Sequence, residues 1–282
     1  MKKIISALAK AICYTLLFVV GQIFAAFVSA AAYAVWASIG PFNAQGVSPD
    51  FDLLLQATMD FTLRYATMIG TAGGACALFV LWAFFRIRGK RLAVETGWRP
   101  NGARQNLRAA LCGACCAFAV CAAMQMLPIP ESMLQSYEEA SAEALGAYHP
   151  LIFACTVFLA PVMEEVIFRG LVYTRLRQAM PQWIAMLLSA LLFGLMHGDP
   201  LWIAYAFLLG CVMAFIYEKS GSLWGSILFH GVFNLFGSYV PIPLEGASAA
   251  GIALLAISLL GGAVLLWRMR AAAKTPCVST EA

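Results

Sequence analysis

The stretch PVMEEVIFRG, from Pro161 to Gly170, places two adjacent glutamates and an arginine inside a run of apolar residues. On a helix with 100° per residue, Arg169 lies about 40° around the axis from Glu165 but about 140° from Glu164. We therefore predict that Arg169 pairs with Glu165, because side chains four residues apart meet on one face of a helix. Glu164 has no such partner and is the carboxylate left free to transfer protons.

Two histidines lie in the apolar runs that follow. In FGLMHGDP, Phe193 precedes His197 by one helical turn, and in HGVFNLF, His230 precedes Asn234 by the same spacing. A charge near the centre of a bilayer costs about 2.5–3.5 kcal/mol, so such residues usually face a cavity or a partner. A lone histidine in an apolar helix is more often a packing residue, but the chain has only 3 histidines and two of them lie here. The combination predicts a site.

A carboxylate, two imidazoles and a carboxamide are the groups needed to activate water and to stabilise an oxyanion in amide hydrolysis. In such a site Glu164, assisted by His197, deprotonates the water, and His230 with Asn234 holds the oxyanion. Alternatively, Glu164, His197 and His230 could bind zinc and leave one position open for water. The sequence leaves both mechanisms open, so no cofactor is certain and zinc is the alternative.

Other hydrolase signatures are missing from the sequence, which has no HExxH, no GxSxG and no pair of intramembrane aspartates. These absences argue against a zincin, a serine hydrolase or an aspartyl protease. A purely structural role stays open for the PVMEEVIFRG stretch, in which Glu165 and Arg169 form an ion pair and Glu164 is a spare acid reaching toward the membrane surface.

The amino-acid composition predicts the fold that positions these residues. Hydrophobic residues make up 62% of the 282 residues and charged residues only 11%, whereas soluble domains have about 45–50% apolar and about 25% charged residues. No barrel-like alternation is visible, so we predict an all-α fold, a polytopic transmembrane helical bundle. Spans of about 20 apolar residues are needed. The eight expected spans are Ile12–Ala34, Thr62–Phe85, Leu107–Leu127, Leu151–Tyr173, Trp183–Met196, Leu201–Tyr217, Leu223–Val240 and Ile252–Trp267.

Charge predicts the orientation of the bundle, because cytoplasmic loops collect Lys and Arg. With the N-terminus inside, all of the 18 basic residues except Arg64 fall on the cytoplasmic side, and both termini are cytoplasmic. The net charge of +4 follows from this bias and calls for no nucleic-acid partner. Acidic residues mark the opposite side: Asp50, Asp52, Asp60, Glu131, Glu138, Glu139 and Glu143.

The N-terminus allows two interpretations. MKK, an apolar stretch and VSAAAYA resemble a signal peptide within residues 1–36, with a cleavage site among small residues. The apolar run exceeds the usual signal-peptide core of about 7–15 residues, which favours a retained first span.

These motifs together resemble the CAAX protease and bacteriocin-processing (CPBP, or Abi) family of intramembrane proteases, the group of type II CAAX prenyl endopeptidases and lysostaphin resistance protein A. The family motifs EExxxR, FxxxH and HxxxN occur in order within about 70 residues. They are matched by Glu164, Glu165 and Arg169, by Phe193 and His197, and by His230 and Asn234.

The resemblance implies a bundle of about eight spans, with an active site inside the membrane and open toward the cytoplasm. It implies that Glu164 and His197 activate water and that His230 and Asn234 support the oxyanion, with Glu165, Arg169 and Phe193 in support. It divides the chain into N-terminal transmembrane helices (1–130), a catalytic core of spans four to seven (150–240), and a last span with a cytoplasmic tail (248–282).

The function implied is an intramembrane endopeptidase that cuts a membrane-anchored or lipidated peptide, in CAAX-type processing or in peptide maturation or immunity. Its partners are that peptide and the lipid bilayer, and its location is a cell membrane, here the bacterial cytoplasmic membrane. A proton-coupled transporter and a non-catalytic membrane scaffold are the alternatives. Transporters often have two matched halves, whereas the polar residues here lie in the second half only.

The depth of the site residues is a further expectation. At 1.5 Å per residue, Glu164 and His230 lie roughly 10–15 Å from the expected cytoplasmic ends of their spans, but His197 lies roughly 20 Å from its end. A tilted helix or a later start of the fifth span is needed to bring the three together.

Overall fold

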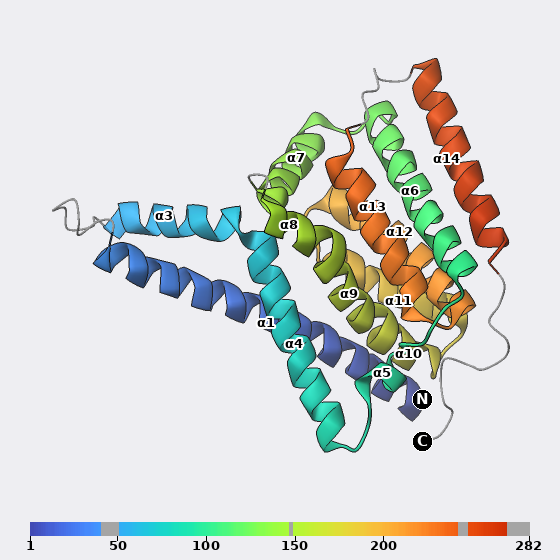
Figure 1. The fold of residues 1–282 in the computed structure, drawn as a ribbon, viewed down its shortest axis with the longest axis horizontal. Helices are drawn as coiled ribbons and strands as arrows, with labels where there is room; N and C mark the ends of the chain where they lie inside the picture. Colours follow the sequence, from blue (N-terminus) through green and yellow to red (C-terminus); the bar gives the residue numbers. More distant parts are fainter. Residues whose placement is uncertain (41–50, 147–148, 242–247, 270–282) are drawn as a thin grey trace.

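The computed structural model describes residues 1–40, 51–146, 149–241 and 248–269. Every regular element within these residues is a helix, which confirms the all-α prediction (Figure 1). The elements are, in chain order, α1 (Lys2–Ile39), α3 (Phe51–Arg64), α4 (Ala66–Ile87), α5 (Leu92–Glu95), α6 (Ala103–Met126), α7 (Glu131–Leu145), α8 (Pro150–Ala154), η1 (Cys155–Leu159), α9 (Ala160–Glu165), η2 (Val166–Tyr173), α10 (Thr174–Arg177), α11 (Gln182–Leu195), α12 (Pro200–Ser220), α13 (Leu223–Tyr239) and α14 (Ala249–Trp267).

Among the described residues, 6 helices are long and apolar enough to cross a membrane: α1, α4, α6, the continuous helix from Pro150 to Arg177, α12 and α14. The fifth and seventh expected spans correspond to shorter helices, α11 with 14 residues and α13 with 17. The count of eight spans and the cytoplasmic termini therefore stay predictions. The small-residue segment VSAAAYA lies inside α1, which continues without a break to Ile39.

The continuous helix Pro150–Arg177 is the most buried of the six candidate spans, with half of its apolar window buried, against 17% for α1 and α14. It packs against α1, α4, α11 and α13, and Ile167, Phe168, Leu171 and Val172 are fully buried among them. Around it, α6 lies between α13 and α14, and α11 pairs with α12. The segment that carries EExxxR is thus the core of the bundle.

This central helix contains two π-helical stretches, η1 and η2, of the kind often found at functional sites. Pro161 stands in the first turn of α9, directly after η1, and it has no N–H to donate. In a π-helix the carbonyl of Thr156 would accept from residue 161, so Pro161 leaves this carbonyl free for another donor. The sequence did not predict the π-helices, although Pro161 marks where the regular pattern fails.

The bundle has two distinct ends. At the first, the α7 end, Ser136 Oγ donates to Asp199 Oδ2 at the start of α12 (2.8 Å), and Thr67 Oγ1 at the start of α4 donates to the carbonyl of Ala144. At the second, the basic end, the Glu95 carboxylate of α5 pairs with Arg175. Helix α7 and the greater part of α3, up to Phe61, lie between the expected spans, where no helix was predicted.

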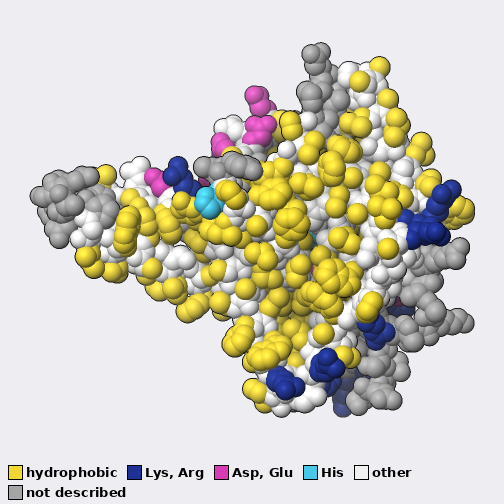
Figure 2. All heavy atoms as spheres, in the orientation of Figure 1, with side chains coloured by type: hydrophobic (Ala, Val, Ile, Leu, Met, Phe, Trp, Pro, Cys, Tyr) yellow, Lys and Arg dark blue, Asp and Glu magenta, His cyan; other side chains and the backbone are white. Residues whose placement is uncertain are grey.

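Charge separates the two ends as expected (Figure 2). Acidic side chains gather over α7, whereas most of the visible Lys and Arg side chains lie at the opposite end of the bundle. Arg64 is an exception at the α7 end, where its carbonyl lies against Gly146. Asp50, Arg270 and Lys274, which were part of the charge argument, lie outside the described residues.

Candidate active site

Glu165 and Arg169 form the predicted ion pair, with Arg169 Nη1 2.7 Å from Glu165 Oε1 and both side chains fully buried. Arg169 Nη2 also donates to the carbonyl of Gly210 on α12 (3.2 Å). The guanidinium lies over the ring of Phe193, 4.4 Å from its centroid, a favourable cation–π geometry. Arg169 therefore ties the central helix to both α11 and α12.

His230 lies between the two glutamates. Its Nδ1 is 3.0 Å from Glu165 Oε1, and its Nε2 is 3.7 Å from Glu164 Oε2. An ionised carboxylate can only accept, so Nδ1 carries the proton in the contact with Glu165. Glu165 thereby fixes the orientation of the ring and directs Nε2 toward Glu164, much as a carboxylate orients a histidine in hydrolase triads. The sequence predicted that these residues meet but not that His230 contacts Glu165.

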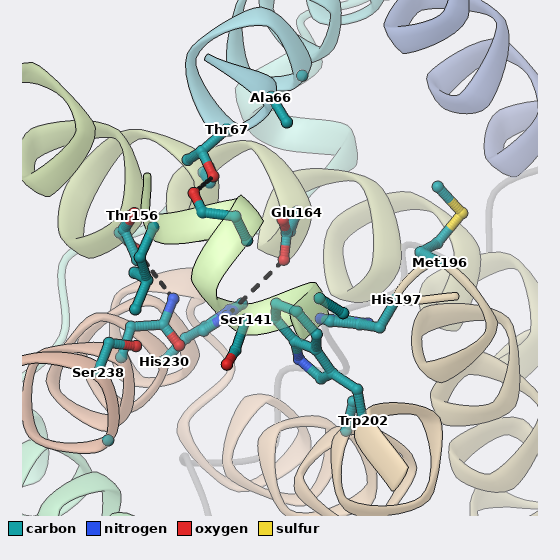
Figure 3. Close-up of a pocket in the computed structure, with 18 of the residues that line it drawn as sticks. Ala66, Thr67, Ser141, Thr156, Glu164, Met196, His197, Trp202, His230 and Ser238 are labelled. Carbon is teal, nitrogen blue, oxygen red and sulfur yellow. Dashed lines mark hydrogen bonds and ion pairs between the residues drawn. The ribbon is translucent and has the colours of Figure 1, made fainter. Parts of the chain in front are cut away.

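Glu164 is the glutamate that faces open space. Its side chain is 21% exposed, whereas that of Glu165 is fully buried, and it lines a cavity of about 700 Å³ together with His197, His230 and Asn234. Figure 3 shows Glu164, His197 and His230 turned toward this space from three different parts of the chain. The separation of the two glutamates into a buried anchor and a cavity-lining carboxylate agrees with the helical-wheel prediction.

His197 follows the end of α11, in the turn that leads into α12. Its Nδ1 is 3.2 Å from the carbonyl of Phe193, and its ring packs edge-on against the Phe193 ring, with centroids 5.0 Å apart. Among the described residues, no hydrogen bond or ion pair joins His197 to Glu164. Both side chains nevertheless line the same cavity.

Phe193 is the packing centre of the site. Besides His197 and Arg169, its ring contacts the rings of His230 and Phe168 edge-on, with centroids 5.7 and 5.4 Å apart. Its side chain is only 2% exposed. The aromatic residue of FxxxH thus positions residues from three helices.

Asn234 is engaged differently from the sequence expectation. Its Nδ2 donates to the carbonyl of Thr156 in η1 (2.9 Å), the carbonyl that Pro161 leaves without a π-helical donor. A carboxamide has two N–H groups, so one remains for a ligand in the cavity. Thr156 was not singled out from the sequence, where it is one threonine in an apolar run without a motif.

Trp202 is a second residue that the motifs did not indicate. Its ring lies 5.3 Å from that of His197, centroid to centroid, and it lines the cavity at the start of α12. Only its proximity to HGDP in the sequence could have drawn attention to it.

The zinc alternative is not supported by the donor arrangement. Within the residues that the structure describes, no three His, Cys, Asp or Glu side chains are grouped so that they could hold a metal ion. Glu164, His197 and His230 line one cavity without forming such a group, and His230 Nδ1 already contacts Glu165.

Two of the expectations concern the side of the membrane on which the site opens. The cavity includes residues of α7 in its walls, so it lies toward the α7 end. The charge rule places the basic end in the cytoplasm, whereas the family resemblance implied a site that opens to the cytoplasm. The orientation of the bundle and the side on which the site opens both stay predictions.

Comparison with known proteins tests the family resemblance predicted from the three motifs. A family model described as type II CAAX prenyl endopeptidase Rce1-like matches residues 146–236, the segment that carries all seven motif residues. Over this segment the chain is similar to the Rce1-like family. The resemblance predicted from the three motifs is thereby confirmed.

Two curated bacterial proteins are similar to parts of this chain. The "Putative membrane peptidase YdiL" of Bacillus subtilis (strain 168) is 29% identical over 87 residues, which are 31% of this chain and 36% of that protein. The "UPF0177 protein YbdI" of Lactococcus lactis subsp. lactis (strain IL1403) is 26% identical over 115 residues, 40% of this chain and 61% of that protein. The chain thus spans less than two thirds of either relative. No solved structure matches.

Proposed function

We propose that this protein is an intramembrane endopeptidase that hydrolyses a peptide bond in a membrane-anchored or lipidated peptide. The observation that carries the proposal is the placement of Glu164 on the wall of the cavity, 3.7 Å from a histidine that a second glutamate orients. Similarity to the Rce1-like family supports a peptide substrate. We place the protein in a bacterial cytoplasmic membrane as a multi-pass protein, with residues 150–240 as its catalytic core.

The carboxylate of Glu164 acts as the general base and takes a proton from a water molecule in the cavity. The water oxygen forms a bond to the carbonyl carbon of the scissile amide, and the carbonyl becomes an oxyanion. Glu164, now protonated, gives its proton to the leaving nitrogen as the carbon–nitrogen bond breaks. His197, on the same cavity, orients the water.

The oxyanion is stabilised by donors that are already in place. His230 Nε2 and the second N–H of Asn234 Nδ2 are the two candidates, and such donors are worth about 10²–10³-fold in rate each. To donate from Nε2 while Nδ1 donates to Glu165, His230 must carry both ring protons.

The test is cleavage of a peptide library by the purified protein in liposomes, with peptides anchored by a transmembrane segment or by a lipid chain. New termini detected by mass spectrometry with the wild-type protein, and none with Glu164→Gln, are the expected result. Substrate flux without any cleavage would identify a transporter instead. Binding that is unaffected by Glu164→Gln and His197→Ala, again without cleavage, would identify a scaffold.

A further inference from the structure

The residues that line the cavity belong to one end of the bundle. They include Ser141 from α7, Thr67 from the first turn of α4 and Ser238 from the last turn of α13. Figure 3 shows these three side chains around the space that Glu164 faces. None of the described residues lining the cavity belongs to α5, α10 or α14. The route from the site to the surface therefore leads toward the α7 end, where residues of α1, α3 and α4 line the cavity together with α7.

The basic end is filled by the segment between α4 and α6. Thr96, directly after α5, is fully buried, and it packs so closely on Gly170 that a Cβ at that glycine would lie 2.6 Å from the Thr96 Cβ. Tyr217 Oη donates to the Thr96 carbonyl (3.0 Å), and Ser222 Oγ donates to the Arg99 carbonyl (2.6 Å). These contacts place packed protein between the cavity and the basic end.

The α7 end, by contrast, is covered by a helix whose contacts are mainly the Ser136–Asp199 and Thr67–Ala144 hydrogen bonds and the edge-on packing of Tyr137 on Trp202 and Tyr205. No residue of α7 is buried, and its cavity-lining residues include the small side chains of Ala140, Ser141 and Ala144. A helix with so little buried surface is held weakly, because burial of apolar area is the main source of stability. A peptide chain can reach the site here with only a small rearrangement.

The distribution of charged residues indicates on which side of the membrane the α7 end lies. The described Lys and Arg residues are concentrated at the basic end, and the acidic residues of α7 lie at the other (Figure 2). Cytoplasmic loops are enriched in Lys and Arg. The basic end is therefore the cytoplasmic one, and the α7 end faces away from the cytoplasm.

From these three observations we infer that the site takes its substrate from the side of the membrane opposite the cytoplasm. The substrate class is a membrane-anchored peptide whose cleaved bond lies toward its outer end, not a prenylated cytoplasmic C-terminus. The inference rests on the proposed function for the identity of the substrate, but the direction of access can be measured without any catalysis.

The experiment uses single cysteines in a variant of the full chain that lacks the 9 native cysteines. Ser141→Cys reports on the cavity, Glu139→Cys on the exposed side of α7, and Lys90→Cys on the basic end, where the Lys90 side chain is 55% exposed. A small charged thiosulfonate reagent that does not cross membranes is added to right-side-out and to inverted membrane vesicles. The rate of labelling is measured for each cysteine.

We expect Ser141→Cys and Glu139→Cys to react at least about tenfold faster in right-side-out vesicles, and Lys90→Cys at least about tenfold faster in inverted ones. The reverse pattern overturns the inference. It is also overturned if Glu139→Cys reacts from outside while Ser141→Cys reacts from neither side, because the cavity then has no aqueous route past α7. Each variant must keep the thermal stability of its cysteine-free parent.

A paired reporter separates this inference from the proposed function. The same cleavable segment is anchored so that it faces either the cytoplasm or the opposite side. Cleavage of the outward-facing reporter alone is expected. Cleavage of the inward-facing reporter alone contradicts the route of access but keeps the peptidase, whereas outward labelling with no cleavage of either reporter contradicts the peptidase but keeps the route.

Discussion

The imidazole of His230 turns back to Glu165, with Nδ1 3.0 Å from Oε1, the same oxygen that Arg169 contacts at 2.7 Å. Glu165 is fully buried and Arg169 is as well, so this single carboxylate holds both a structural cation and a histidine of the site. The adjacent position, Glu164, is thereby left as the only one of the two glutamates that lines the cavity. Glu165 therefore contributes both to the stability of the fold and to the orientation of His230.

Removing one partner of the Glu165–Arg169 pair should destabilise the fold strongly. Arg169→Met leaves a buried carboxylate beside His230 without its cation, and breaking a buried pair in this way costs about 3–5 kcal/mol. The double variant Glu165→Gln/Arg169→Met should lose less than the sum of the two single variants. Denaturant unfolding in detergent measures the free energy of unfolding of each variant.

The matched control for the buried pair is Arg177→Met. Arg177 Nε is 3.1 Å from Glu218 Oε1, but the Arg177 side chain is 37% exposed. Partly exposed pairs contribute only about 0–1 kcal/mol. Equal losses for Arg169→Met and Arg177→Met would show that burial does not set the strength of the Glu165–Arg169 pair.

Glu164→Gln should abolish turnover while the protein remains folded. The amide has nearly the size of the carboxylate but cannot take a proton from water, and loss of a general base typically costs about 10²–10⁴-fold in rate. The thermal unfolding temperature should stay within a few degrees of the wild type, because Glu164 lines the cavity and is not part of the buried pair. Cleavage kinetics in liposomes and a thermal melt are the two measurements.

Glu139→Gln on α7 serves as the control for Glu164→Gln, since it removes an exposed carboxylate at the same end of the bundle. It should leave kcat unchanged. Wild-type turnover by Glu164→Gln would remove this residue from the mechanism.

Gly210 is needed for the contact between α12 and α11. A Cβ at Gly210 would lie 2.9 Å from the Cβ of Ala190 and 3.4 Å from Arg169 Nη2. Gly210→Ala should therefore push the helices apart and disturb the arginine, at a cost of about 1–3 kcal/mol, as for other overpacked sites. The double variant Ala190→Gly/Gly210→Ala removes the clashing methyl group but leaves the Cα of residue 190 at 3.0 Å, so it should recover only part of the stability lost in Gly210→Ala.

Gly237→Ala provides the comparison within a helix. A Cβ at this position would meet the Phe233 ring at 3.8 Å, an ordinary contact, so this variant should be at least as stable as the wild type. A similar loss of stability in both glycine variants would indicate a general effect of the substitution and not the clash with Ala190.

The pair of Glu165 and Arg169 could be predicted from sequence because it depends on one helix only. The angle between two positions four residues apart is fixed by helix geometry, and the small π-helical distortion in η2 does not break the contact. The three motifs likewise predicted that Glu164, His197, His230 and Asn234 line one site.

The contacts that could not be predicted from the sequence depend on how separate helices are placed relative to one another. The contact of His230 with Glu165 requires the position of α13 relative to α9, and the bond from Asn234 to Thr156 requires a π-helix that no local pattern specifies. Helix α7 was missed for a different reason. Its sequence, ESMLQSYEEASAEAL, is rich in good helix formers. It is too polar to resemble a membrane span, however, and the predicted helices were all membrane spans.

Glu95 offers a test of the contacts that fill the basic end. Burial raises the pKa of its carboxyl group, but hydrogen bonding and attraction to Arg175, together with Lys90, more than offset this and hold the pKa below its ordinary value of 4.5. The folded protein then binds fewer protons at this site than the unfolded chain. The stabilisation is complete above pH 4.5 and is lost as the pH falls through the lower, folded-state value.

Wild-type protein should therefore be more stable than Glu95→Gln at neutral pH, and this difference should shrink as the pH falls below 4.5. Thermal unfolding of both proteins between about pH 7 and pH 3 measures it, with Glu139→Gln as a control that keeps the wild-type dependence. A difference that stays constant over the whole range would mean that the charge of Glu95 does not hold α5 against Arg175.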